Sequence, residues 1–382
     1  MGWLGSGGVS SRGLRVVLIL GVVSMFGDFV YEGGRSVLPD FMRQLGMSAF
    51  LIGTVLGLSE LAGWVARPLG GFVADRTGRL TTIVWIGYAG LIVVPLMAFA
   101  GSWYVLALLV FAERVLRGLR APGRDAMLAR LRSGLGLGMA FGIHELLDQL
   151  GATLGPLLAI IITALTQETR HVFLTLLIPY ALLLATLTKL PRYSESPQTT
   201  PRARPPRKAA LFSAAVGLNA AGLLPISIIL YLVSQDAGAG SWLVPAAYTT
   251  AMVVDAAAAV LLGRAFDRAG PVVLAVTMIL AVAPCLLVGL GVESLFLAAA
   301  LVGVVISAQE SVFRAMVAQL AADGGLGGSY AAYGLALGVG SAAAGLVYGL
   351  MVDLGLGALH LLAYSAAMQA AAVATLLKAI EK

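Results

Sequence analysis

The chain carries little charge and almost no cysteine or histidine. Charged residues make up 12% of its 382 residues, and there are only one cysteine and three histidines. A single cysteine, Cys285, excludes an intrachain disulfide, and the shortage of thiols and imidazoles argues against a metal cluster. No GxxxxGK[ST] segment occurs, so a nucleotide-binding loop of that type is absent. The sequence therefore predicts no metal and no other cofactor.

Apolar residues are abundant instead. They make up 59% of the chain, and the mean hydropathy is +0.93, which is more apolar surface than a soluble core of this length can bury. The apolar runs last about 20 residues without strand-like alternation, and backbone in hydrocarbon must satisfy its own hydrogen bonds. We therefore predict an all-α integral membrane protein with lipid as its main partner.

Polar, glycine and proline residues divide the chain into twelve predicted membrane-spanning helices. Their expected ranges are 14–43, 49–74, 80–100, 103–130, 135–166, 170–190, 209–234, 241–266, 271–291, 294–321, 328–353 and 357–378. Each range is long enough to cross a bilayer with some tilt.

Lysine and arginine are concentrated in every second loop between these runs. If the N-terminus is cytoplasmic, only Arg43 and Arg170 fall outside, so the positive-inside rule predicts a multi-pass cell-membrane protein with both termini cytoplasmic. The net charge of +6 then reflects topology, and we expect no nucleic-acid partner. The long, basic, proline-rich stretch 191–208 becomes a cytoplasmic linker between six-helix units at 1–190 and 209–382.

The two units repeat one another. Gly71, Asp75, Arg76 and Gly78 recur as Gly263, Asp267, Arg268 and Gly270, each displaced by 192 residues. A duplicated six-helix unit explains this match, and in such an architecture a substrate site lies between the halves near the middle of the bilayer.

The stretch GGFVADRTGRL at 70–80 resembles the GxxxDRxGR signature of the major facilitator superfamily, and GRAFDRAG at 263–270 occupies the matching loop of the second half. The resemblance implies two pseudo-symmetric six-helix bundles and transport of a small solute by a monomer. Its charged residues would form a cytoplasmic gate that latches the halves. The implied gate residues are Gly71, Asp75, Arg76, Gly78, Arg79, Gly263, Asp267 and Arg268. Alternatively, the arginines only anchor the topology.

A second resemblance lies on the expected fifth helix. Gly151, Gly155 and Pro156 are similar to the GxxxGP motif of drug and metabolite exporters in this superfamily. The same spacing also forms a small-residue face for close helix packing, which explains the segment without any bearing on direction.

Charged residues follow one face of the first and fourth expected helices. Asp28, Tyr31, Glu32 and Arg35 are spaced at i, i+3, i+4 and i+7, and charges at that depth must face protein or a water-filled cavity. In the superfamily, helices one, four, seven and ten line the central cavity. The substrate-cavity residues expected here are Tyr31, Arg35, Glu113, Arg117, Arg120, Asn219, Gln309, Glu310 and Arg314. Alternatively, Glu113 with Arg117 and Glu310 with Arg314 are i,i+4 ion pairs that merely permit insertion.

Asp28 and Glu32 are two acids one helical turn apart. Repulsion between them and burial both disfavour the doubly charged state, so we expect one of them to couple protons to transport. Alternatively, the two acids form a static ion network with Arg35 and Arg117.

On the fifth expected helix, His144 and Asp148 are also one turn apart. Two ligands fall short of a metal shell, so a hydrogen-bonded pair is the simpler interpretation. Glu60 and Arg67 lie two turns apart on the second expected helix. We expect each to pair with neighbouring residues and assign both a structural role.

These patterns together predict a secondary transporter, and not an enzyme, because no nucleophile with an oriented base is visible. Proton-coupled efflux of a small amphipathic drug or metabolite is the first expectation. A proton-coupled organic-anion carrier is the alternative, because guanidinium groups suit carboxylates and phosphates. A non-transporting membrane receptor and a membrane-embedded enzyme are the alternatives from other classes.

Overall fold

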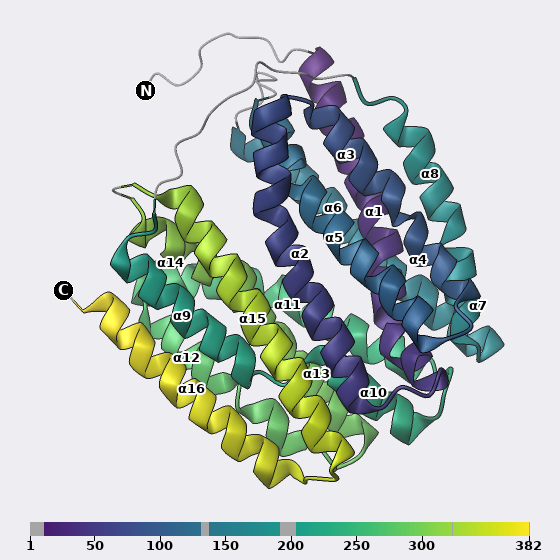
Figure 1. Ribbon diagram of the computed structural model, residues 1–382, viewed down its shortest axis with the longest axis vertical. Helices are drawn as coiled ribbons and strands as arrows, with labels where there is room; N and C mark the ends of the chain where they lie inside the picture. The colour runs from purple at the N-terminus through teal and green to yellow at the C-terminus, as the bar shows by residue number, and fades with distance from the viewer. Residues whose placement is uncertain (1–10, 131–136, 192–203, 323, 382) are drawn as a thin grey trace.

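The computed structural model describes residues 11–130, 137–191, 204–322 and 324–381, and within these ranges every regular element is a helix (Figure 1). The first part comprises α1 Ser11–Gln44, α2 Ala49–Thr77, α3 Leu80–Ala89, η1 Gly90–Ile92, α4 Val93–Leu96, η2 Met97–Phe99, α5 Trp103–Arg130, α6 Leu137–Thr166, α7 Thr169–Thr175 and α8 Leu177–Leu187. The second part comprises α9 Arg207–Gly222, α10 Ile226–Ala237, α11 Leu243–Ala269, α12 Val272–Leu280, η3 Ala283–Leu287, α13 Val292–Glu310, α14 Val312–Leu320, α15 Leu326–Asp353 and α16 Ala358–Ile380. The predicted all-α membrane class is confirmed.

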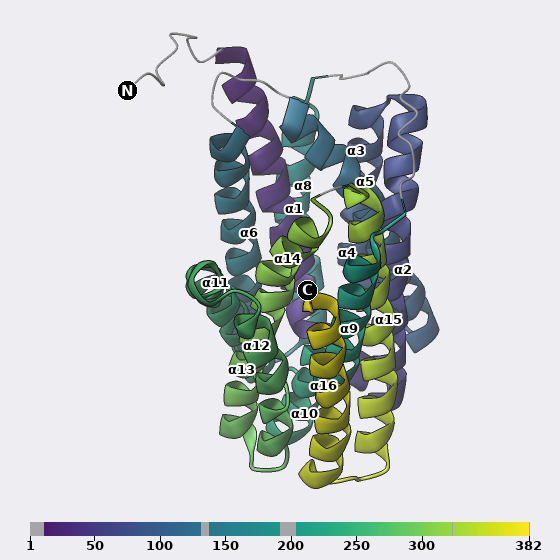
Figure 2. The same cartoon turned by 90° about the vertical axis from the view of Figure 1, so that its left-hand side faces the viewer.

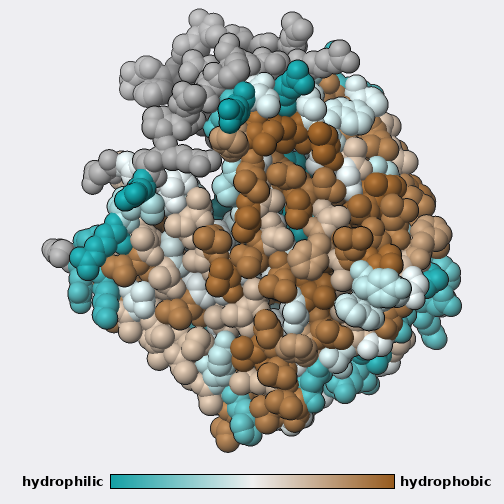
Figure 3. Space-filling view, viewed as in Figure 1, coloured by the Kyte–Doolittle hydropathy of each residue, from teal (hydrophilic) through white to brown (hydrophobic). Residues whose placement is uncertain are grey.

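Ten helical segments of the described chain are long and apolar enough to cross a membrane. The segment Val272–Leu287 is apolar but shorter. Helix α5 has 28 residues but carries Glu113, Arg114, Arg117 and Arg120 along its length. The predicted count of twelve is therefore reached only when α5 and Val272–Leu287 are both included. Long helices run side by side along the molecule, and apolar residues cover the middle of the face in Figure 3 (Figures 2 and 3).

Two expected spans contain a residue whose backbone leaves the helical region, Leu223 in the seventh and Ser311 in the tenth. Pro225 has no N–H, and the chain leaves the helix at Leu223 between α9 and α10. The carbonyl of Gly222 accepts hydrogen bonds from the Tyr348 hydroxyl at 2.7 Å and the Ser365 hydroxyl at 2.6 Å. A second break falls at Ser311 between α13 and α14. At the first break the backbone thus has partners from the neighbouring helices α15 and α16, whereas Ser311 bonds within its own segment to the carbonyl of Ser307.

Separate hydrophobic cores form on either side of the linker. One core is built only from residues between Val16 and Leu190, whereas the others draw almost wholly on residues after 208. We call α1–α8 the N-terminal half and α9–α16 the C-terminal half, and we propose that they are the two repeats. Within the expected linker at 191–208, residues 192–203 lie outside the described ranges.

Helices α2 and α15 join the halves through a seam of glycines. A methyl group on Gly53 would lie 1.9 Å from the carbonyl oxygen of Gly345, and one on Gly349 would lie 2.5 Å from that of Ala49. Only glycine permits this approach. The seam lies at one end of the molecule, whereas the other ends of α2 and α15 lie apart in Figure 1. We call the end that carries Arg76, Arg79, Arg264 and Arg268 the basic end, and the seam end the closed end.

Side chains also link the halves at the closed end. The carboxylate of Asp40 on α1 accepts hydrogen bonds from the Ser234 hydroxyl of α10 and from the backbone N–H of Gly240 at 3.0 Å. The carboxylate of Asp353 accepts from the N–H groups of Ala49 and Phe50, at 2.9 and 3.0 Å, in the first turn of α2. An anion at a helix N-terminus is favourable because those N–H groups have no partner within the helix.

The two loops of the repeated motif share a helix-ending glycine but differ after it, since ψ is 2° at Gly78 and −142° at Gly270. Gly78 and Gly270 end α2 and α11 with positive φ angles of 64° and 60°, and each donates its N–H to the carbonyl four residues earlier, of Ala74 and Phe266. The glycine that packs tightly is Gly70, where a methyl group would lie 2.2 Å from the oxygen of Leu119, and not Gly71. Gly263 has open space around it. Gly71 and Gly263 therefore make no close helix contact in this conformation.

Candidate functional site

A cavity of about 370 Å³ lies between the two halves. Its lining is unusually charged for a membrane protein, with arginine as the only basic residue type. The seven arginines are Arg35, Arg67, Arg114, Arg117, Arg120, Arg124 and Arg314, and the seven acids are Asp28, Glu32, Glu60, Glu145, Asp148, Asp255 and Glu310. The formal charges of these fourteen side chains cancel.

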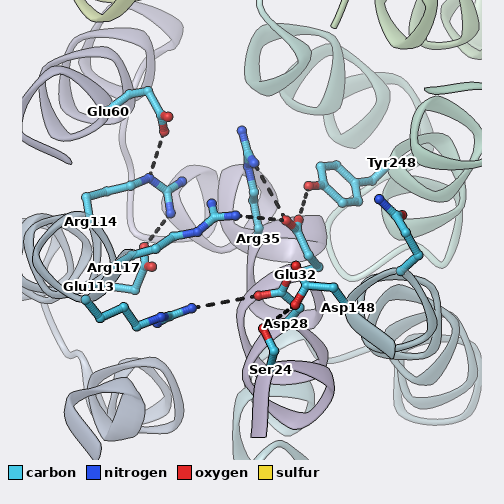
Figure 4. Close-up of polar contacts among 12 residues, drawn as sticks. Ser24, Asp28, Glu32, Arg35, Glu60, Glu113, Arg114, Arg117, Asp148 and Tyr248 are labelled. Atoms are coloured by element: carbon cyan, nitrogen blue, oxygen red, sulfur yellow. Dashed lines mark hydrogen bonds and ion pairs between the residues drawn. The ribbon is translucent and has the colours of Figure 1, made fainter. Parts of the chain in front are cut away.

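The acidic stripe of α1 faces this cavity, as the spacing predicted. Glu32 lies 3.9 Å from both Arg35 and Arg117, and its carboxylate accepts a hydrogen bond from the Tyr248 hydroxyl of the C-terminal half (Figure 4). Asp28 lies 3.8 Å from the guanidinium of Arg120. Distances near 4 Å are long for ion pairs, which leaves room for these groups to change partners.

Helix α5 supplies arginines from four successive turns, and each one has an acidic neighbour. Arg117 and Arg120 reach the acids of α1. Arg114 lies 3.1 Å from Glu60 of α2 and also contacts Glu113. Arg124 lies 3.1 Å from Asp125 and 3.9 Å from Asp148 of α6. The arginine excess predicted for this helix is thus neutralised by partners on three other elements and on α5 itself.

The two i,i+4 ion pairs offered as a structural alternative do not form in the described chain. Glu113 contacts Arg114 and not Arg117, whose partner is Glu32. Glu310 ends α13 and Arg314 lies on α14, and no ion pair within 4.0 Å joins them among the described residues. The break at Ser311 explains the second case, because it removes the helical register on which the pairing relied.

Most of the residues predicted for the substrate cavity line it, but three lie behind its wall. Arg35, Arg117, Arg120, Gln309, Glu310 and Arg314 are lining residues. Tyr31 is buried and packs its ring 3.8 Å from the guanidinium carbon of Arg117. Asn219 is fully buried and bonds to Gln309 and Gln369 at 2.8 Å. Glu113 is buried against Arg114.

Several lining residues were not predicted. Tyr248 and Asp255 lie on α11, whose place in the cavity wall has no local sequence signal. Glu60 and Arg67 lie on α2 and had been assigned to structural pairing. Asp148 accepts a hydrogen bond from the Ser24 hydroxyl of α1, while the Tyr88 hydroxyl lies 3.0 Å from Ser24 (Figure 4). The available clue to Asp148 was its i,i+4 spacing from His144, which the sequence favoured as a hydrogen-bonded pair.

No cluster of three metal-ligating side chains occurs within the described residues. His144 is buried, and its Nε2 has no hydrogen-bond partner there.

The exporter-like segment of α6 packs tightly on α1. A methyl group on Gly151 would lie 1.9 Å from the carbonyl oxygen of Met25, and one on Gly155 would lie 2.3 Å from that of Phe29. The two helices therefore approach to backbone contact directly beside Asp28 and Glu32. This is the packing role that the small-residue spacing allowed.

Comparison with known proteins places these features among transporters. The family model described as Major Facilitator Superfamily matches residues 17–235. The chain is 33% identical over 366 residues to the uncharacterized protein Rv2265 of Mycobacterium tuberculosis (strain ATCC 25618 / H37Rv), covering 90% of this chain and 88% of that protein. The uncharacterized protein Mb2288 of Mycobacterium bovis matches equally well.

Solved transporters share the fold at low sequence identity. The D323A mutant of the nucleoside transporter NupG gives a TM-score of 0.75 at 15% identity, over 94% of this chain and 99% of that one. A POT family transporter in complex with 5-aminolevulinic acid gives 0.76 at 14% identity, over 96% and 97%. A bacterial homologue of the human lysosomal transporter Spinster, inward-facing and occupied, gives 0.70 at 14% identity, over 96% and 95%.

Proposed function

The chain belongs to the major facilitator superfamily, and from this premise we propose that it is a proton-coupled secondary transporter that exports a small amphipathic drug or metabolite by alternating access. The observation that carries the proposal is the pair of acids on α1, Asp28 and Glu32, at the wall of a cavity between the halves. Opening of the cavity to alternate sides changes the water around such acids, and this is how a proton gradient can drive a carrier.

The partners of the two acids support this assignment. Glu32 is held by Arg35 and Arg117 from its own half and by Tyr248 from the other, so relative motion of the halves changes its surroundings. A carboxyl that loses a hydrogen-bond donor or a nearby positive charge binds a proton more readily. Rocking of the halves would therefore change the hydrogen bonding of Glu32 directly. It would change the surroundings of Asp28 through its neighbour Arg120.

The proposed direction and orientation rest on the sequence. Export follows from the GxxxGP-like segment at Gly151–Pro156, and a cytoplasmic basic end follows from the positive-inside rule. On that orientation the cavity is open to the cytoplasm in this conformation, because the halves meet at the closed end. We propose a monomer in the cell membrane with both termini cytoplasmic.

The test uses proteoliposomes and the charge-neutral variants Asp28→Asn and Glu32→Gln. A thermal-shift screen with drugs, amino acids and organic anions first identifies a transported probe. With a pH gradient imposed, we expect at least one variant to lose accumulation of the probe while keeping substrate exchange. The variant Asp236→Asn, at an exposed site outside the cavity, is the matched control.

Gradient-driven accumulation by both variants would mean that neither acid couples protons, and the stripe would then be a static ion network. Counter-flow of the probe in the wild type separates a transporter from a receptor with the same fold, since a receptor binds without exchange.

A further inference from the structure

Some charged side chains of the cavity have no ion-pair partner within 4.0 Å among the described residues. Five of the seven arginines have an acid within 4.0 Å, and the two without one among the described residues are Arg67 and Arg314. Glu145, Asp255 and Glu310 likewise have no arginine at that distance in the described chain. Of these three, Glu145 accepts a hydrogen bond from Gln149 at 3.3 Å on its own helix.

Arg67 is held in place but its hydrogen-bond donors are not used by an acid. Its guanidinium lies 4.1 Å from the centre of the Trp64 ring, and this stacking leaves the edge donors of the group free to bind. The Trp64 ring in turn lies against α15 of the other half, where a methyl group on Gly334 would meet it at 2.5 Å. Arg67 therefore stands at the interface between the halves.

Contacts of neighbouring residues bring four of these five charges to one part of the cavity. The Trp64 ring under Arg67 meets Gly334 of α15, and one turn earlier on α15 the Tyr330 hydroxyl donates a hydrogen bond to the carbonyl of Arg314 at 3.3 Å. The hydroxyl of Ser307, one turn before Glu310 on α13, donates to the backbone carbonyl of Asp255 at 2.8 Å. Arg67 and Arg314 therefore line the cavity from opposite halves beside the same turn of α15, and Asp255 and Glu310 lie near each other within the C-terminal half.

Like charges placed side by side repel unless a counter-charge lies between them. A plain anion would satisfy Arg67 and Arg314 but leave Asp255 and Glu310 without a partner and the neutral cavity with a net negative charge. A plain cation would satisfy Asp255 and Glu310 but leave Arg67 and Arg314 without a partner and the cavity with a net positive charge. A molecule with an acidic group at one end and an ammonium group at the other satisfies all four and keeps the cavity neutral.

We infer that the cavity binds a small zwitterion, with its acidic group between Arg67 and Arg314 and its ammonium group against Asp255 and Glu310. The inference rests on the proposed transport function and narrows its substrate class. Since the acidic group would contact both halves, its binding removes the repulsion between Arg67 and Arg314. The loaded protein could then close at the basic end more easily than the empty one.

The experiment measures thermal stabilisation of the purified full chain by three matched series of compounds. The zwitterions are glycine, β-alanine, γ-aminobutyrate and ε-aminocaproate, and the comparison compounds are the carboxylates and the amines of the same chain lengths. We expect at least one zwitterion to raise the melting temperature more than its matched carboxylate and amine. The response should depend on chain length, because the two charged groups must reach both pairs of charges.

Two variants test the ends separately. Arg314→Gln and Glu310→Gln change exposed side chains, so folding should be retained. Each should weaken the apparent affinity for the best zwitterion by about tenfold or more, as expected for loss of a charged hydrogen bond. Arg15→Gln removes a positive charge at an exposed site outside the cavity and should leave the affinity unchanged.

Three results would overturn the inference. The first is stabilisation by a carboxylate alone that equals the best zwitterion, which would indicate a plain anion site. The second is no response to any zwitterion in the series. The third is wild-type affinity in both variants, which would indicate that neither Arg314 nor Glu310 contacts the ligand. None of these outcomes affects the proton-coupling test with Asp28→Asn and Glu32→Gln, so the two proposals can fail separately.

Discussion

Three acids of α1 are almost equally buried but have different kinds of partner, with Asp40 near the C-terminal end of the helix and Asp28 and Glu32 in its middle. Asp40 is 1% exposed, Glu32 6% and Asp28 7%. Asp40 accepts hydrogen bonds from neutral donors: the hydroxyls of Ser234 and Thr169, the Gln44 amide at 2.8 Å and the Gly240 N–H at 3.0 Å. Asp28 and Glu32 instead face arginines at 3.8–3.9 Å across a cavity.

The difference shows that burial alone does not separate a structural acid from a coupling acid. A carboxylate that accepts four hydrogen bonds from neutral donors is held in one position by the surrounding structure. A carboxylate with distant arginines and access to a cavity can exchange partners when the cavity changes shape. Since the donors to Asp40 come from α7, α10 and the loop after it, this acid ties the halves together, whereas Glu32 and Asp28 are placed to respond to their motion.

The largest effect is expected from Asp40→Asn. The amide nitrogen of asparagine would replace at least the oxygen that accepts from Ser234, and the bonds to the remaining oxygen would lose their negative charge, so the protein should be destabilised by about 2–3 kcal/mol. The measurement is thermal unfolding in detergent, with the exposed Asp236→Asn as the control at the same end. An unchanged melting temperature would remove the contrast between Asp40 and the cavity acids.

A smaller effect is expected from Tyr248→Phe, which sharpens the comparison at Glu32. The variant removes one hydrogen bond to the carboxylate and keeps the ring, so stability should fall by about 1.5 kcal/mol. Because this bond joins the halves, the coupling of transport to the pH gradient should weaken as well. The control is Tyr104→Phe, whose side chain is exposed on the outer surface. Full coupling in Tyr248→Phe would show that Glu32 does not sense the C-terminal half.

The smallest effect on stability is expected at the basic end, from Asp75→Asn and Asp267→Asn. Asp267 is exposed and Asp75 is half-buried, so unfolding should change by less than about 0.5 kcal/mol. Cycling should nevertheless slow severalfold, because the gate at this end would lose charged hydrogen bonds in the conformation that closes it. Initial transport rates decide the matter, and wild-type rates in both variants would contradict the gate.

The sequence was sufficient for features that depend on local pattern. Apolar runs and the repeated glycine–aspartate–arginine motif predicted the fold class, and the spacing of Asp28 and Glu32 placed both on the cavity face. The positive-φ turns at Gly78 and Gly270 follow from the same repeat. Each of these features involves residues within one helix or one loop, so periodicity and spacing carry the necessary information.

Features that depend on contact between distant segments could not be predicted. The neutral donors of Asp40 lie 129 to 200 residues away in three cases, and the break at Ser311 separates Glu310 from Arg314 although their spacing suits an ion pair. Glu60 and Arg67 were both expected to pair with neighbouring residues. In the structure Glu60 pairs with Arg114 of α5, whereas Arg67 stacks on Trp64 and lines the cavity.

The glycine seam between α2 and α15 has a further consequence for repeated motion. Contact there is made by backbone atoms of Gly53, Gly345 and Gly349, which present almost no apolar side-chain area. Adhesion between surfaces in water grows with the apolar area that they hide, so parting this seam would wet little hydrocarbon. The two helices can thus approach more closely than leucine-faced helices could and still separate at low cost. A contact of this kind can open and close in every transport cycle without a large loss of free energy.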